Sequence, residues 1–146
     1  MAHNMMPEAL IRFGLDAALR DFCNDINASG ALVVNYQSIA LKDATLDQSI
    51  SITLFRIVQE LIHNTMKHAG ANSALVQISL SVGKLFVTVE DDGRGFDSSQ
   101  LQSSPGIGWT NIISRVEFLK GKWDIASKAG EGTSVHIELD VRAQTA

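Results

Sequence analysis

The sequence is poor in the features that mark secreted, membrane-spanning or nucleic-acid-binding proteins. Cys23 is its single cysteine, which excludes an intrachain disulfide and a cysteine-based metal site. No apolar run approaches membrane-spanning length, and no charged start precedes an apolar stretch as in a signal peptide. The net charge is −4 and no Lys/Arg run occurs, which argues against a nucleic-acid-binding surface. These absences favour a cytoplasmic protein, in which Cys23 is expected to be a small buried side chain on a helix.

The remaining composition is typical of one globular domain. Apolar residues make up 45% of the 146 residues and charged residues 19%, and this length can bury a core without disulfides or a metal. We expect a single domain over residues 7–141, preceded by a disordered or cloning-derived start at 1–6 and followed by a frayed tail at 142–146. No internal repeat or linker divides the chain.

Periodicity in the hydrophobic residues predicts a mixture of helices and strands. Helical spacing appears over residues 8–26, 47–69 and 109–121. Alternating or short apolar runs predict strands over residues 31–36, 74–82, 85–90, 122–127 and 133–141. Gly83-Lys84 is expected to be a two-residue hairpin turn, and this connection is too tight for a parallel pair. The order predicts an α+β fold, a two-layer sandwich whose mostly antiparallel sheet carries about three helices on one face.

The central helix of residues 47–69 combines a buried stripe with an unusual polar row. We expect Ser49 or Ser51 to cap its start and Gly70 to end it. The predicted buried stripe consists of Ile52, Phe55, Val58, Leu61, Ile62, Thr65, Met66 and Ala69. Spacings of four, four and three place a polar row on another side, flanked by His63 and His68, and made of Arg56, Glu60, Asn64 and Lys67.

Two interpretations of this polar row remain open. It can be a solvated face with an ion pair between Arg56 and Glu60. However, asparagine is unfavourable inside a helix, because its amide competes for backbone hydrogen bonds. An amide oxygen one turn from a carboxylate, with Lys67 nearby, instead suits a magnesium-phosphate group, since Mg²⁺ prefers oxygen ligands and shares its shell with phosphates.

Three glycine-containing segments punctuate the second half of the chain: "DDGRGF" (91–96), "SSPGIGWTN" (103–111) and "GEGT" (130–133). Each taken alone is explained by a turn or a flexible loop. The first follows a strand directly, so Asp91 can accept a hydrogen bond from an amino group, while Gly93 and Gly95 allow close approach of a ligand. The second opens a helix, where backbone N–H groups can face phosphate. Neither a P-loop nor a Rossmann fingerprint is present.

Taken in order, E-L-I-H-N-T-M-K-H-A, D-D-G-R-G-F, G-I-G and G-E-G-T resemble the motifs of the GHKL ATPase superfamily, which includes gyrase, MutL and histidine kinases. Within it, residues 7–141 look like the catalytic ATP-binding domain of a two-component sensor histidine kinase, in the branch of nitrate-sensing and desaturase-regulating kinases. Residues 7–27 are similar to the segment that connects the phosphoacceptor helices to this domain. The resemblance implies the Bergerat fold, with ATP and Mg²⁺ between the helices and a lid.

On the phosphate side, the resemblance implies roles for four residues and for the lid. Glu60 would be the catalytic carboxylate and would act as a general base or as an orienting group. Asn64 would coordinate Mg²⁺. Lys67 would neutralise phosphate charge, and His68 would lie near the phosphates. Residues 97–105 would form the ATP lid.

On the adenine side, Asp91 would accept a hydrogen bond from the adenine amino group, and Gly93 and Gly95 would line the pocket. Thr133 would reach the adenine through a water shared with Asp91. Gly106 and Gly108 would lie at the lid hinge beside the phosphates, and Ile107 could cover the adenine ring. The sequence departs from the pattern at Thr65, where alanine is commoner, and at Trp109, where leucine or methionine is usual. Packing in the core is the expected role of Phe96.

The resemblance also implies partners that the sequence does not supply. A histidine kinase transfers phosphate to a histidine on a separate dimerisation domain and then to a response regulator, and the whole kinase would be a homodimer. His3, His63, His68 and His136 do not lie in such an acceptor context. We therefore expect the chain to bind ATP·Mg²⁺ without phosphorylating itself; acid-labile phosphate incorporated from radiolabelled ATP by the chain alone would contradict this. Alternatives are a serine kinase of the anti-sigma-factor type, a degenerate binding module, or a hydrolytic ATPase.

Overall fold

The computed structural model describes residues 8–41, 46–97 and 107–141. The expected terminal segments, Gly106 and all of the expected lid except Asp97 lie outside these ranges. Only the backbone is described for four further residues, His68, Ala69, Ile107 and Gly108.

A five-stranded mixed sheet organises the fold, with the strand order β1-β2-β3-β5-β4. The strands are β1 (Val33–Ile39), β2 (Ser73–Ser81), β3 (Lys84–Asp91), β4 (Lys122–Ser127) and β5 (Thr133–Asp140). Only β1 and β2 are parallel, and the other neighbours are antiparallel. The five predicted strands are thus confirmed, as is the mostly antiparallel sheet.

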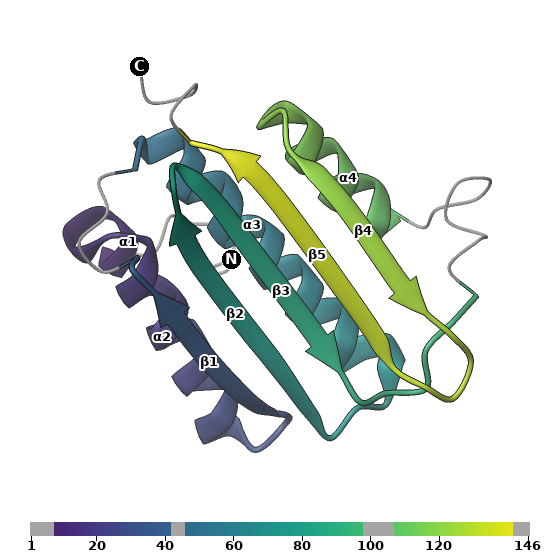
Figure 1. Ribbon diagram of the computed structural model, residues 1–146. Helices are drawn as coiled ribbons and strands as arrows, with labels where there is room; N and C mark the ends of the chain where they lie inside the picture. The colour runs from purple at the N-terminus through teal and green to yellow at the C-terminus, as the bar shows by residue number, and fades with distance from the viewer. Residues whose placement is uncertain (1–7, 42–45, 98–106, 142–146) are drawn as a thin grey trace.

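The helices cover one face of the sheet, as Figure 1 shows. They are α1 (Glu8–Phe13), α2 (Leu15–Ser29), α3 (Gln48–Asn64) with its π-helical continuation η2 (Thr65–Ala69), and α4 (Ile107–Phe118). In Figure 1, α1 and α2 lie behind the β1 side, α3 behind the centre and α4 behind the β4 side. This arrangement confirms the two-layer sandwich expected from the sequence.

The predicted first helix is divided at Gly14. Its φ of 90° and ψ of −175° separate α1 from α2. Residues with a side chain rarely adopt this backbone conformation, because their Cβ collides with the neighbouring carbonyl. Glycine has no Cβ and therefore permits the break. The sequence pattern continued through this point because Leu10 and Leu15, on either side, both enter the core.

The predicted start of α3 is wrong in detail. Asp47 is the N-cap residue, so the helix begins before Ser49 and Ser51. The Ser49 hydroxyl donates to the Asp47 carboxylate at 2.7 Å, whereas Ser51 is buried inside the first turns. The predicted end is confirmed, because Gly70 adopts a left-handed conformation after η2.

The core lies between the sheet and the helices. Cys23 is buried there, as predicted, and burial raises the pKa of its thiol to about 11. The buried face of α3 is wider than the predicted stripe, since Leu54 and Ile57 are both fully buried. Met66, predicted to be buried, is 38% exposed. It lies in η2, where hydrogen bonds span five residues and a 3.6-residue period no longer predicts which side a residue faces.

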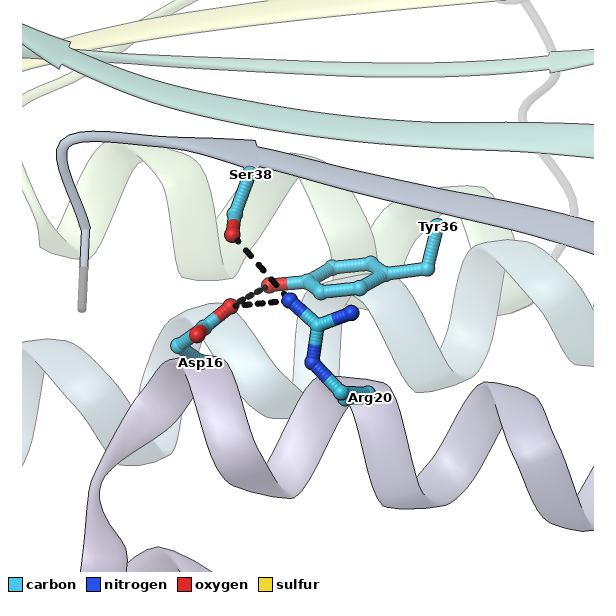
Figure 2. A network of polar contacts seen from close by, with 4 residues as sticks. All are labelled: Asp16, Arg20, Tyr36 and Ser38. Atoms are coloured by element: carbon cyan, nitrogen blue, oxygen red, sulfur yellow. Dashed lines mark hydrogen bonds and ion pairs between the residues drawn. The ribbon is translucent and has the colours of Figure 1, made fainter.

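A polar network ties α2 to the edge strand β1 (Figure 2). The Tyr36 hydroxyl donates to the Asp16 carboxylate at 2.7 Å, and the Arg20 guanidinium lies 5.1 Å from the centre of the Tyr36 ring. Arg20 also donates to the Ser38 hydroxyl at 3.5 Å. Burial, reinforced by the hydrogen bond to Asp16, raises the pKa of Tyr36 above its usual range, so its hydroxyl remains a donor.

The hairpin between β2 and β3 turns at Val82-Gly83, one residue before the predicted Gly83-Lys84. Both turn residues have positive φ, 51° and 74°, as a type I′ turn requires. A branched side chain is strained in this region, whereas asparagine tolerates it.

We therefore expect Val82→Asn to raise the free energy of unfolding by about 1 kcal/mol. Val82 is 84% exposed, so the substitution loses little packing. Urea denaturation of both proteins measures the change. Val33→Asn is the matched control, because Val33 is also an exposed valine but is not among the described residues with positive φ. Equal effects of the two substitutions would contradict the turn-strain explanation.

Candidate functional site

Four residues form a row across one end of the sheet. Asp91, the last residue of β3, is opposite Ala74 of β2 and Thr133 of β5, and Thr133 is opposite Ser127 of β4. Directly opposed residues share a face of the sheet, and Ala74 and Ser127 are buried. The row therefore lies on the helix-covered face. Figure 1 shows the ends of β3 and β4 here, together with the start of β5 and the end of the α3 helix.

The Asp91 carboxylate is held from both layers of the fold. Its Oδ1 accepts a hydrogen bond from the Gly93 amide at 2.8 Å, in the segment that follows β3. Its Oδ2 lies 3.3 Å from the hydroxyl of Thr65, at the start of η2. The carboxylate is half-buried, so it keeps one side for a further donor.

Ser127 joins the first and third glycine segments. Its hydroxyl accepts a hydrogen bond from the Phe96 amide at 2.9 Å and donates to the Gly132 carbonyl at 3.0 Å. A hydroxyl has one proton and two acceptor sites, so Thr133, at 2.9 Å, must donate to Ser127. The Thr133 oxygen is then left to accept from other groups. Sequence reasoning missed Ser127, because a serine at the end of a strand carries no distinctive signal.

The glycines allow these two segments to touch. Gly95 has a φ of 66°, and a Cβ there would lie 2.1 Å from the Lys128 carbonyl oxygen. At Gly132, φ is 78° and a Cβ would lie 2.2 Å from the Asp91 carbonyl oxygen. Gly93 is buried but is not among the described glycines with positive φ. The D-D-G-R-G-F and G-E-G-T segments therefore form one packed unit around Asp91.

Asp92, next to Asp91, fixes the end of β3 to the start of β2. Its carboxylate accepts hydrogen bonds from the Asn72 amide at 2.8 Å, the Ser73 amide at 3.0 Å and the Ser73 hydroxyl at 2.9 Å. Hydrogen bonds from Ser73 and Asn72 lower the pKa of Asp92. Sequence reasoning assigned no separate role to Asp92, because Asp91 and Asp92 belong to one motif.

The polar row of the central helix approaches this site from the helix layer. Glu60 and Asn64 are half-buried at the end of α3, and Lys67 is exposed on η2. The ring of His63 instead packs edge-on against Phe22 of α2, with centroids 6.1 Å apart. Of this helix, Thr65 makes the direct contact with Asp91.

The second glycine segment meets the first through aromatic rings. Trp109, in the first turn of α4, lies 5.6 Å from the Phe96 ring, centroid to centroid. Both side chains are half-buried. Trp109 packs against the hydrophobic core, whereas Phe96 is not among the described residues that do so, and the expected core role of Phe96 is not confirmed. The contact between the two rings anchors the start of α4, including Ile107 and Gly108, beside the D-D-G-R-G-F segment.

Neither a dedicated metal cage nor a membrane-spanning helix occurs in the described part of the chain. Within residues 8–41, 46–97 and 107–141, no group of three or more His, Cys, Asp or Glu side chains is arranged to hold a metal ion. The helices of these same ranges are too short or too polar to cross a membrane.

The fold and this site agree with the comparisons with known families. A family model described as histidine kinase-, DNA gyrase B- and HSP90-like ATPase matches residues 49–143. The chain therefore belongs to this family, and the resemblance seen in the sequence motifs is confirmed.

Its similarity to curated proteins points to the sensor kinases within that family. The chain is 30% identical over 136 residues to the signal transduction histidine-protein kinase/phosphatase DegS of Brevibacillus brevis, covering 93% of this chain and 35% of that protein. It is 28% identical over 137 residues to the oxygen sensor histidine kinase NreB of Staphylococcus carnosus, covering 94% of this chain and 39% of that protein. It thus spans little more than a third of these relatives.

Solved structures share the fold. The blue-light activated histidine kinase of Erythrobacter litoralis EL346 is 28% identical with a TM-score of 0.72, and the match covers 90% of this chain and 43% of that chain. The Acinetobacter baumannii histidine kinase AdeS is 14% identical with a TM-score of 0.63, covering 86% and 62%, and supports the fold alone. The Bergerat-type sandwich is confirmed.

Proposed function

We propose that this chain is the catalytic ATP-binding domain of a sensor histidine kinase and supplies the phosphoryl group for histidine phosphorylation. The observation that carries the proposal is the Asp91 carboxylate, held by Thr65 and Gly93 beside the Thr133 hydroxyl. The names of the relatives support it, since they are histidine kinases.

Adenine recognition would take place at the end of the sheet. The amino group of adenine is a donor, and the Asp91 carboxylate is an oriented acceptor. The Thr133 hydroxyl has its proton directed to Ser127, so its oxygen would accept from a water shared with Asp91. Gly93 and Gly95 would line the pocket beside the base. Gly95 would do so through its backbone, because the space that a side chain would take there is occupied by the Lys128 carbonyl.

The triphosphate would lie along the polar end of α3 and η2. Asn64 presents an amide oxygen one turn after Glu60, and this oxygen fits a Mg²⁺ ion that takes its remaining ligands from phosphate oxygens and water. When bound, that ion would neutralise phosphate charge. Lys67 would do the same from η2 with His68 nearby, and Glu60 would orient the attacking nucleophile.

The hinge of the lid would lie at the start of α4. Backbone N–H groups at a helix N-terminus suit phosphate, so Gly106, Ile107 and Gly108 would contact the nucleotide there. The contact between Trp109 and Phe96 supports this placement, because it keeps the first turn of α4 next to the adenine side.

The acceptor histidine would come from a dimerisation and phosphoacceptor domain of the same kinase, reached through the α1–α2 region. A response regulator would receive the phosphate from that domain, and the whole kinase would be a cytoplasmic or membrane-attached homodimer. A serine kinase of the anti-sigma-factor type would use the same nucleotide site, but the histidine-kinase relatives favour the first function.

Titration of the chain with ATP by calorimetry tests this proposal. We expect binding that changes with Mg²⁺ and ignores GTP, because the Asp91 carboxylate accepts from an amino group but not from the oxo group of guanine. Asp91→Asn is expected to weaken ATP about tenfold, or 1.4 kcal/mol, since a charged acceptor is replaced by a neutral amide.

Asp124→Asn is the matched control. It makes the same change of charge at an exposed position of β4, on the sheet face opposite the Asp91 row. Its affinity for ATP should equal that of the native chain. Absence of ATP binding by the native chain, or equal weakening by both variants, would refute adenine recognition at Asp91.

A further inference from the structure

Thr65 occupies an unusual place for a threonine hydroxyl. It is the first residue of η2, its side chain is 5% exposed, and its Oγ1 lies 3.1 Å from the Leu61 carbonyl oxygen and 3.3 Å from Asp91 Oδ2. A π-turn at the end of a helix often marks a functional site. This hydroxyl is the described hydrogen-bond link between the helix layer and Asp91.

The single proton of this hydroxyl has two acceptors to choose from. The Leu61 carbonyl already accepts the backbone N–H of Thr65, so it does not depend on the side chain. A carboxylate oxygen forms the stronger, charge-assisted hydrogen bond. A positioning role for Thr65 requires that this proton points to Asp91 Oδ2, the stronger acceptor. The Leu61 carbonyl oxygen is the nearer of the two, and the back-bond to it is the commoner choice for a helical threonine.

The two oxygens of Asp91 are then restrained from different elements. Gly93 holds Oδ1 from the segment after β3, and Thr65 holds Oδ2 from η2. The terminal torsion of an aspartate is otherwise broad, so a single contact would leave the carboxylate free to rotate. Two contacts on different oxygens fix its plane.

We propose that Thr65 is a positioning residue for Asp91, which sets the orientation of the carboxylate before a nucleotide binds and thereby increases selectivity for the 6-amino group of adenine. This inference rests on the proposed adenine recognition at Asp91. An acceptor held in place before binding loses less freedom when the ligand arrives.

Calorimetric titration with two nucleotides tests the role of Thr65. The nucleotides are ATP and purine riboside triphosphate, which differs from ATP only by lacking the 6-amino group. Thr65→Val removes the hydroxyl and is expected to weaken ATP about fivefold while changing the affinity for the analogue less than twofold. Thr65→Ser keeps a hydroxyl and should restore the native preference for ATP.

Two further variants separate positioning from helix stability. Thr53→Val removes another back-bonding hydroxyl, whose contact is the Ser49 carbonyl at 2.7 Å on α3, and should leave both affinities unchanged. Thr65→Ala also removes the hydroxyl, without the added methyl group, and gives the same test if Thr65→Val does not fold.

The outcomes distinguish this inference from the proposed function. If the native chain prefers ATP to the analogue but both hydroxyl-free variants keep that preference, or weaken both nucleotides equally, the positioning role is overturned and the adenine site stands. If the native chain does not prefer ATP to the analogue, recognition of the amino group at Asp91 is wrong, and the role of Thr65 falls with it.

Discussion

Replacing Gly132 by alanine is expected to lower the free energy of unfolding by about 3 kcal/mol and to abolish measurable ATP binding. The residue has a φ of 78°, and an added Cβ would lie 2.2 Å from the carbonyl oxygen of Asp91. That oxygen belongs to the backbone, so the end of β3 must shift to relieve the overlap. The shift would move the carboxylate that is proposed to bind adenine. Urea denaturation and ATP titration measure the two effects.

Gly130→Ala provides the matched control in the same turn. Gly130 also has a positive φ, 83°, but an added Cβ would meet nothing within 4 Å. The control therefore carries the backbone strain without the collision, and should cost about 1 kcal/mol with ATP binding retained. Equal losses of stability and affinity in the two variants would show that positive φ, rather than contact with Asp91, decides the effect at Gly132.

The order of helices and strands followed from the sequence because each element carries its own periodic pattern. Buried residues alternate with more accessible ones from Lys84 to Val89 in β3 and from Ser73 to Ile78 in β2. The break at Gly14 did not follow, because the apolar pattern is continuous across it. The turn at Val82-Gly83 was misplaced by one residue, since a valine with positive φ opposes its own local preference.

For the site, the sequence identified the residues that belong to a recognisable motif. It missed the residues that hold those motif residues in place. Asp91 and Gly95 were named from D-D-G-R-G-F, and the structure brings them next to Thr133. The contacts from Thr65 and Ser127 depend on how η2 and the β4–β5 turn pack against β3, which no local pattern encodes. The roles of Glu60 and Asn64 toward phosphate remain predictions.

Ser127→Ala is expected to lower the free energy of unfolding by about 2 kcal/mol and to weaken ATP severalfold. Ser127 is 8% exposed, and its loss leaves the Phe96 amide and the Gly132 carbonyl without their partner. An unsatisfied buried donor or acceptor costs about 1–3 kcal/mol. The Thr133 hydroxyl also loses the acceptor of its proton and would reorient. This hydroxyl is the group proposed to accept a hydrogen bond from the adenine-side water. Urea denaturation and ATP titration again give both quantities.

Ser134→Ala separates this role from the general loss of a serine hydroxyl. Ser134 follows Thr133 in β5 and therefore points to the other face of the sheet, where its hydroxyl donates to the Glu90 carboxylate at 2.9 Å. That face is not covered by helices (Figure 1), so water can replace the lost contact, and the change should stay within about 0.5 kcal/mol. A Ser127→Ala protein as stable as Ser134→Ala would mean that the two glycine segments hold together without the serine, through backbone packing at Gly95 and Gly132 alone.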